Sequence, residues 1–349
     1  MKATDLLTRP RSRVSPGPGP RTRASAALAR PSSPSRALRQ SGWGALALAV
    51  GLTAAFGATT GQLGTMRVVT TVLMYVVLTE SWTVLGGFGG YLNFGMVLFF
   101  GVGAYTTAIV SSHTGITPLA TVLAAGGVAG VLGVLIGVPS LRLRGAYFAI
   151  VTFVLTLAIQ QLVMVLGITN GALGLYLKPV ALGPRASDEL YYFIFLGAAV
   201  VLMLAVRKIA SSRFGSALVA IREDEDAAEV LGVPTTRVKT IAFVFAAVVA
   251  GMVGCVYASQ LYYIEPVDTF AFSLSLNVVV AAIVGGAQTW VGPLLGAVAT
   301  QLISQELLIH TQGVQGNLVL GALLIVFARF VPGGIVGVFR RRRAVKVGI

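Results

Sequence analysis

Five of the chain's 12 acidic residues lie between positions 223 and 229. Carboxylates gathered in this way either bind a metal ion or present negative charge to a basic partner. Adjacent carboxylates on a helix point in different directions, and neither of the two histidines, His113 and His310, lies nearby. The pattern therefore favours a charged docking surface over a metal site, with a solvated acidic loop as the alternative.

A short helix is predicted for this acidic segment. Glu223 and Asp224 can cap its N-terminus, and Gly232 followed by Pro234 is a typical stop signal. The helix between them has about eight residues, and isolated helices shorter than ~12–15 residues are marginal in water. We therefore expect this helix to dock against something.

Two faces of this helix differ in character. Ala227, Ala228 and Leu231 are expected to form one narrow apolar stripe, with Glu225, Asp226 and Glu229 on the other side. A stripe flanked by carboxylates suits a groove on a partner protein with basic residues at its rim.

Glu80 is a further candidate for a functional role, because its carboxyl group lies inside the apolar stretch 66–85. A carboxylate within a membrane helix costs at least ~2.5 kcal/mol on insertion scales, so it normally faces a cavity or a partner. Two interpretations remain open. Glu80 lines or supports a solute path, or it lies near the cytoplasmic end of its helix and reaches water.

Two glycine runs, at 86–90 and at 285–286, adjoin apolar segments. Glycine is unfavourable inside helices, so these runs predict either broken or re-entrant helices or close helix packing. A helix end exposed within the protein would offer free amides to a solute carboxylate. The candidate residues for a translocation path are Glu80, Gly90, Asn93, Gly286 and Gln288.

The composition indicates the class of fold that holds these residues in place. Of 349 residues, 56% are hydrophobic and 11% are charged, whereas soluble domains carry about 25% charged residues. We predict an all-α polytopic membrane protein, because apolar runs near ~20 residues span a bilayer and the short alternating segments of a β-barrel are absent. About ten segments are expected: 43–60, 66–85, 92–112, 117–138, 146–167, 190–206, 239–259, 271–286, 290–309 and 314–331.

The net charge of +14 could indicate nucleic-acid binding, but its distribution argues against that. Basic residues concentrate in the loops 139–145 and 207–238 and in the tail 340–349, which predicts that these loops and both termini are cytoplasmic. Residues 1–42, which are rich in basic residues and proline, are expected to form a disordered cytoplasmic arm. A secretory signal is the weaker alternative. The permease domain is expected to span 43–339.

The sequence predicts no catalytic activity for this chain on its own. We find no Ser/His/Asp set, no metal cluster and no GxxxxGK[ST] phosphate-binding loop. The chain is therefore expected to be no enzyme, to bind no cofactor and to depend on a separate polypeptide for energy. Cys255 is interpreted as a small packing residue, and the histidines as interfacial side chains.

Five blocks of the sequence, in order, resemble one family. They are Gly86 to Ala108, Pro139 to Phe153, Phe214 to Phe243, Val278 to Val298 and Phe327 to Phe339. They are similar to the branched-chain amino acid permeases of ATP-binding cassette importers, of the LivM type. Within the third block, the resemblance rests on a Phe-Gly pair, the run Arg222 to Glu225, an alanine pair and a Gly-Val pair.

The resemblance implies a permease subunit that forms half of a translocation path in the bacterial inner membrane. Its expected partners are a second permease subunit, two cytoplasmic ATPases that bind ATP, a periplasmic or lipid-anchored solute-binding protein, and the lipid bilayer. The acidic segment would be the coupling helix that contacts an ATPase. Its residues are Arg222, Glu223, Asp224, Glu225, Ala227, Ala228, Glu229, Leu231 and Gly232.

Two alternatives stay open at this point. One is a permease of the same family for urea or short amides. The other is a secondary transporter driven by an ion gradient, which would need several membrane-buried charges, whereas only Glu80 qualifies.

Overall fold

The computed structural model describes residues 63–178, 182–310 and 334–337. The predicted spans 43–60 and 314–331, the arm 1–42 and the tail 340–349 lie outside the described residues. Within the described part, the chain is helical apart from short loops and one two-residue strand pair.

Eleven labelled α-helices lie between residues 63 and 310, and residues 334–337 are also helical. They are α2 (Leu63–Thr83), α3 (Met96–Thr114), α4 (Val122–Ser140), α5 (Ala146–Val165), α6 (Pro184–Ala210), α7 (Arg213–Glu223), α8 (Glu225–Val230), α9 (Thr235–Leu261), α10 (Pro266–Thr269), α11 (Phe272–Gly285) and α12 (Gly292–His310). The minor elements are the π-helix η2 (Val84–Phe88), the 3₁₀-helices η3 (Pro118–Thr121), η4 (Gly167–Thr169) and η5 (Gly171–Leu173), and the strands β1 (Leu175–Tyr176) and β2 (Tyr263–Ile264).

The prediction of an all-α polytopic membrane protein is confirmed. Each of the eight predicted segments that fall on described residues corresponds to a helix. Seven helices in the described part are long and apolar enough to cross a membrane, with α10 and α11 counted as one. The apolar part of α12, Gly292–Ser304, is shorter.

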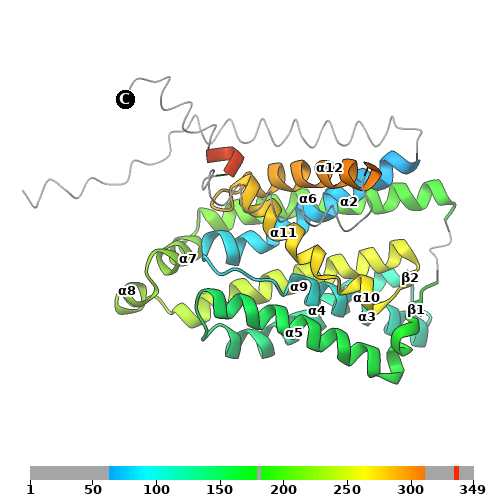
Figure 1. Cartoon of the computed structure of the whole chain (residues 1–349), viewed down its shortest axis with the longest axis horizontal. Coiled ribbons are helices and arrows are strands. Elements are labelled where there is room, and N and C mark those ends of the chain that lie inside the picture. The colour runs from blue at the N-terminus through cyan, green and yellow to red at the C-terminus, as the bar shows by residue number, and fades with distance from the viewer. Residues whose placement is uncertain (1–62, 179–181, 311–333, 338–349) are drawn as a thin grey trace, which may run out of the picture. The chain divides into compact units, whose positions relative to one another are not determined.

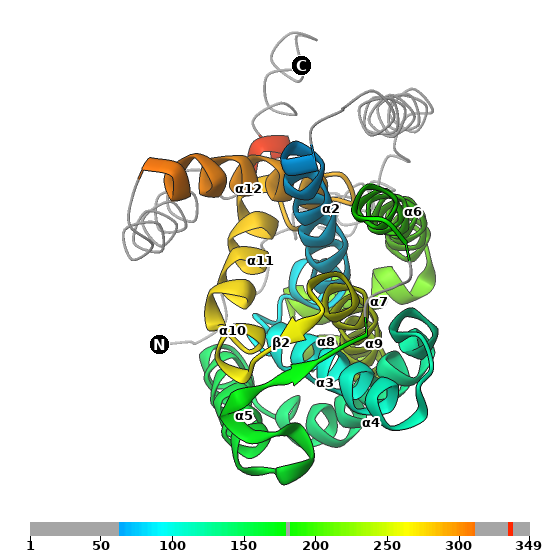
Figure 2. The ribbon, with the colours of Figure 1, turned by 90° about the vertical axis from the view of Figure 1, so that its right-hand side faces the viewer.

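Helices α2, α3 and α9 form the interior of the bundle. They bury most of their residues, whereas α4, α5 and α6 bury about a third or less of theirs. Figure 2, which looks along the bundle from the end with β1 and β2, shows α9 beside α3 and α4. The outer helices carry exposed apolar side chains such as Leu135, Ile150 and Val201. A bilayer would cover such side chains.

Glycines let α3, α4 and α9 approach backbone to backbone. A Cβ atom on Gly103 would lie 2.1 Å from the carbonyl oxygen of Gly251, and one on Gly254 would lie 2.0 Å from that of Phe100. A Cβ on Gly251 would lie 2.4 Å from the Ala129 side chain. Membrane helices lack a hydrophobic drive to associate, so close packing through small residues is what holds these three together.

The bundle has two distinct ends. In Figure 1, α7 and α8 lie at the left, and β1, β2 and α10 lie at the right. The loop 139–145 lies at the α7–α8 end, because Arg144 contacts Asp226. Two spans, α5 and α6, separate the loops 139–145 and 207–238, so both loops lie at the same end, as the charge distribution predicted.

Close packing of α3 against α9 gives the first prediction. We expect Gly254→Ala to destabilise the protein by about 1–3 kcal/mol, because the new methyl group must displace the backbone at Phe100. Gly127→Ala on α4 is the matched control, since nothing lies within 4 Å of the added Cβ. Chemical unfolding of the purified protein in detergent measures both. Equal stability of the two variants would contradict the packing described above.

Candidate functional site

Helices α7 and α8 connect two membrane helices, α6 and α9. Helix α7 begins after Ser212, whose hydroxyl accepts a hydrogen bond of 3.2 Å from the Gly215 amide. It buries Gly215, Leu218 and Ile221 against the bundle. The sequence analysis treated 207–238 as a loop with one short helix, so α7 was missed.

Helix α8 begins and ends where its sequence signals predicted. The Asp224 side chain accepts a hydrogen bond of 3.0 Å from the Ala227 amide and so caps the N-terminus. Gly232 follows the helix with φ of +87°, a conformation that favours glycine. The helix has six residues rather than about eight.

The predicted apolar stripe of α8 is wrong in its orientation. Ala228 is only 2% exposed and packs against its own protein. Val230 and Leu231, by contrast, are 89% and 83% exposed, and Ala227 and Glu229 are exposed as well. Ala228 lies three residues after Glu225, so the two side chains share the face of the helix that is turned toward the bundle.

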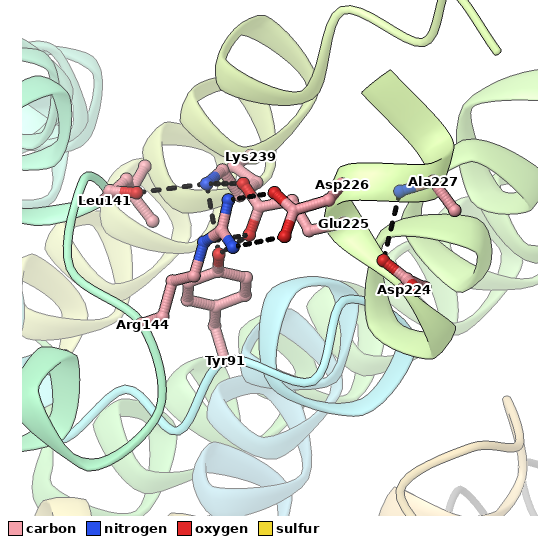
Figure 3. Close-up of polar contacts among 8 residues, drawn as sticks. All are labelled: Tyr91, Leu141, Arg144, Asp224, Glu225, Asp226, Ala227 and Lys239. Atoms are coloured by element: carbon pink, nitrogen blue, oxygen red, sulfur yellow. Dashed lines mark hydrogen bonds and ion pairs between the residues drawn. The ribbon is translucent and has the colours of Figure 1, made fainter. Parts of the chain in front are cut away.

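Glu225 also points inward, opposite to its predicted position on the outer face. Its carboxylate accepts a hydrogen bond of 2.5 Å from Lys239 Nζ at one oxygen and one of 2.5 Å from the Tyr91 hydroxyl at the other. The side chains of Glu225 and Lys239 are 11% and 4% exposed. Figure 3 shows the two charges between α8, α9 and the segment that precedes α3.

Every donor of the lysine ammonium is used. Lys239 Nζ donates to Glu225, to the carbonyl oxygen of Leu141 at 3.0 Å and to the Tyr91 oxygen at 3.0 Å. An ammonium has three donors and no acceptor. The cluster Glu225–Lys239–Tyr91–Leu141 is therefore complete, and it joins α8 to α9, to the segment after α2 and to the end of α4.

Arg144 adds an outer layer to this cluster. Its guanidinium donates two hydrogen bonds to Asp226, of 2.8 and 3.0 Å, and its Nε lies 3.3 Å from the Glu225 carboxylate. Arg144 and Asp226 are both exposed, so this pair contributes less than the buried one.

The charges in the cluster are set by these contacts. Burial raises the pKa of Glu225, but the hydrogen bonds from Lys239 and Tyr91 and the charges of Lys239 and Arg144 outweigh burial, so the pKa is lowered overall. Burial raises the pKa of Tyr91, and the bond to Glu225 and its charge raise it further. Glu225 is therefore an anion at neutral pH, and Tyr91 keeps its proton as a donor.

A small cavity of about 200 Å³ opens beside the cluster. It is lined by Gly89, Gly90, Tyr91, Arg144, Gly145, Ile221, Arg222 and Glu225. Arg222 lies against Gly90, donates to the carbonyl oxygen of Gly87 at 3.3 Å and pairs with Glu223. Gly90, a predicted path residue, is thus part of the α7–α8 end.

Glu80 lies elsewhere, on α2 where that helix packs against α12. It is 0% exposed, so the interpretation in which it reaches water is wrong. The backbone of Leu294, in the first turn of α12, faces its carboxyl group. Neither carboxyl oxygen completes a hydrogen bond with the described residues.

The two glycine runs bring the segment after α2 against the α11–α12 junction. A Cβ on Gly87 would lie 1.9 Å from the carbonyl oxygen of Ala287. Gly286, with φ of +110°, ends α11, and Thr289 caps α12 by accepting from the Gly292 amide at 3.0 Å. Close packing and a broken helix, stated as alternatives from sequence, therefore occur together.

The remaining two path candidates differ in position. Asn93 is buried, its side chain accepts from the Gly95 amide at 2.8 Å, and its carbonyl accepts from Trp82 Nε1 at 2.8 Å. Gln288 is exposed. Among the described residues, no group of three His, Cys, Asp or Glu side chains could hold a metal ion.

Sequence reasoning missed the partners of Glu225. Lys239 was taken as the start of a span and Arg144 as a topology signal, and Tyr91 was not singled out. One signal was available: Lys239 is the last cation before the apolar run that follows it, 14 residues after Glu225. A charge at that depth needs a partner.

Comparison with known proteins decides the family. Residues 64–328 match the family described as the permease component of branched-chain amino acid transport systems. The chain belongs to this permease family. It is 28% identical over 316 residues to the high-affinity branched-chain amino acid transport system permease protein LivM of Salmonella typhimurium, and to that of Escherichia coli K12. The alignments cover 82% of this chain and 73% of each relative. No solved structure matches the chain.

The buried pair predicts a specific pattern of stability in this permease. We expect Lys239→Met to destabilise the protein by roughly 3 kcal/mol, because it leaves the Glu225 carboxylate with Arg144 as its only ion-pair partner among the described residues. The double variant Lys239→Met/Glu225→Gln should lose less than the two single variants combined. Arg144→Met, the exposed control, should cost less than about 1 kcal/mol. Additive losses in chemical unfolding would contradict the pairing.

The lowered pKa of Glu225 predicts a pH dependence. The ionised carboxylate stabilises the fold fully above its usual pKa of 4.5, and this contribution is lost as the pH falls through the lowered pKa of the folded protein. The stability difference between wild type and Glu225→Gln should therefore be constant from neutral pH down to 4.5 and shrink below it. Unfolding curves across this range measure the difference, and a difference that grows in acid would contradict the assignment.

Proposed function

We propose that this permease works in an ATP-driven importer for branched-chain or related amino acids, powered through α8 by a separate ATPase. The family match over residues 64–328 carries the proposal. Both relatives are named for branched-chain amino acids, so permeases for urea or amides and ion-coupled carriers are not favoured.

The outer face of α8 is the proposed contact with the ATPase. Its exposed apolar residues Val230 and Leu231 lie next to exposed acids at Glu223, Asp224 and Glu229. Exposed side chains of this kind at one end of a membrane bundle suit a groove with an apolar floor and a basic rim. ATP would bind to the partner, and this chain would bind no cofactor.

The buried cluster would transmit the motion of the ATPase. A displacement of α8 acts through Glu225 on Lys239 at the start of α9, and through Tyr91 on the segment that follows α2. Helix α9 packs along α3 and α4, so it would carry the displacement into the bundle. A two-state change needs such a contiguous rigid link.

The complete transporter would contain further subunits. We propose a second permease subunit, two ATPases and a solute-binding protein as partners, in a bacterial inner membrane with the α7–α8 end and both termini in the cytoplasm. The basic residues of the loops 139–145 and 207–238 support this orientation. A solute path is proposed along α2 and the α11–α12 junction, with Glu80, Asn93, Gly286 and Gln288.

Binding to the ATPase gives a direct test. We expect Leu231→Asp to abolish co-purification of the partner ATPase and ATP-dependent uptake, because it puts a charge in the centre of the apolar contact. Ser216→Asp on α7 is the control: it adds the same charge at an exposed position near a helix N-terminus, where an acid is tolerated. Leucine uptake that persists in cells without the ATPase would contradict the proposed function.

A further inference from the structure

Among the described residues, Glu80 has no partner that would neutralise a buried carboxylate. The adjacent hydroxyl groups of Thr79, Ser81 and Thr83 each donate to a carbonyl of their own helix, at 2.7–2.8 Å. None of them is bonded to Glu80, and both its oxygens are without a partner among the described residues. An unsatisfied carboxyl group in this position is unfavourable, and its retention indicates that another state of the protein uses it.

The first turn of α12 has one amide to offer. The Gly292 amide donates to Thr289, Pro293 has no amide hydrogen, and the Leu295 amide donates to Val291 at 3.3 Å. The Leu294 backbone remains, and it faces Glu80. The N-terminus of this 19-residue helix therefore directs its partial positive charge at the carboxyl group.

Where the glycine runs meet, the segment after α2 contacts the α11–α12 junction through backbone atoms. There Gly87 meets the backbone of Ala287 directly. The α11–α12 hairpin itself is held together by similar contacts, with Gly285 against Gly292 and Gly296 against Ala281. A movement of this hairpin as one body relative to α2 would expose Glu80 and the N-terminus of α12 together.

We propose that Glu80 and the first turn of α12 form the binding site for the zwitterionic head group of the solute. The carboxylate of Glu80 binds the ammonium group, and the N-terminus of α12 binds the carboxylate. In the closed structure the Glu80 carboxyl group lies where the solute carboxylate would bind. The N-terminus of α12 lies where the solute ammonium group would bind. This inference rests on the proposed function, because it requires an amino-acid solute.

A charge-neutral variant tests the site in the assembled transporter. Glu80→Gln keeps the size of the side chain and an oxygen for the Leu294 amide, but it removes the negative charge. With ATP and binding protein present in proteoliposomes, we expect L-leucine uptake to fall at least about tenfold, as for the loss of one hydrogen bond to a charged group. Thr79→Val is the matched control, because it removes a fully buried polar group from the adjacent position, and its uptake should equal that of wild type.

The outcomes separate the two proposals. Undiminished uptake by Glu80→Gln overturns the zwitterion site and leaves the proposed function standing. A wild-type transporter that takes up no branched-chain amino acid overturns the proposed function itself. If Glu80→Gln does not assemble with its partners, chemical labelling of Glu80 in the wild-type transporter tests the site instead. Saturating L-leucine should slow the labelling of Glu80 by dicyclohexylcarbodiimide, as measured by mass spectrometry, and unchanged labelling overturns the site.

Discussion

A lysine ammonium and a glutamate carboxylate, buried together where α8 meets α9, constrain most of the functional end of this permease. Neither Lys239 nor Glu225 can leave the other without leaving a charge in an apolar environment. Their pairing fixes which side of α8 faces inward, and it thereby places Val230 and Leu231 on the surface. The cluster also uses every donor of the ammonium, so the position of α8 is defined by geometry as well as by charge.

The glycine contacts of the bundle determine how closely its helices pack. Between α3, α4 and α9 they bring backbones close enough to form one packed unit, and α9 runs from the buried pair to the opposite end at β2. At the α11–α12 junction, Gly87 contacts the backbone of Ala287 directly. The transport cycle that we propose uses a unit that moves with α8 and a hairpin that moves relative to Glu80.

The sequence was sufficient for those features that depend on local physics. Apolar runs near the thickness of a bilayer predicted every membrane helix in the described part, and Asp224 and Gly232 marked the ends of α8. The inward turn of Glu225 could not be predicted from its own segment, because its partners Lys239 and Tyr91 are distant in sequence. The same holds for Gly90, which was grouped with Glu80 by proximity in sequence but packs against Arg222. Helix α7 was missed because it has only 11 residues, too few to span a bilayer, and it lies within a charged loop.

The central claim is that α8 moves together with the α9–α4 unit through the buried pair. Double electron–electron resonance measures the distance between spin labels at Glu229 on α8 and at the exposed Val131 on α4. This distance tests the claim in the assembled transporter. The account predicts the same distance between the two labels in the nucleotide-free and the ATP-bound states. A distance that changes by several ångströms between these states would show that α8 moves independently of the bundle and would contradict the account.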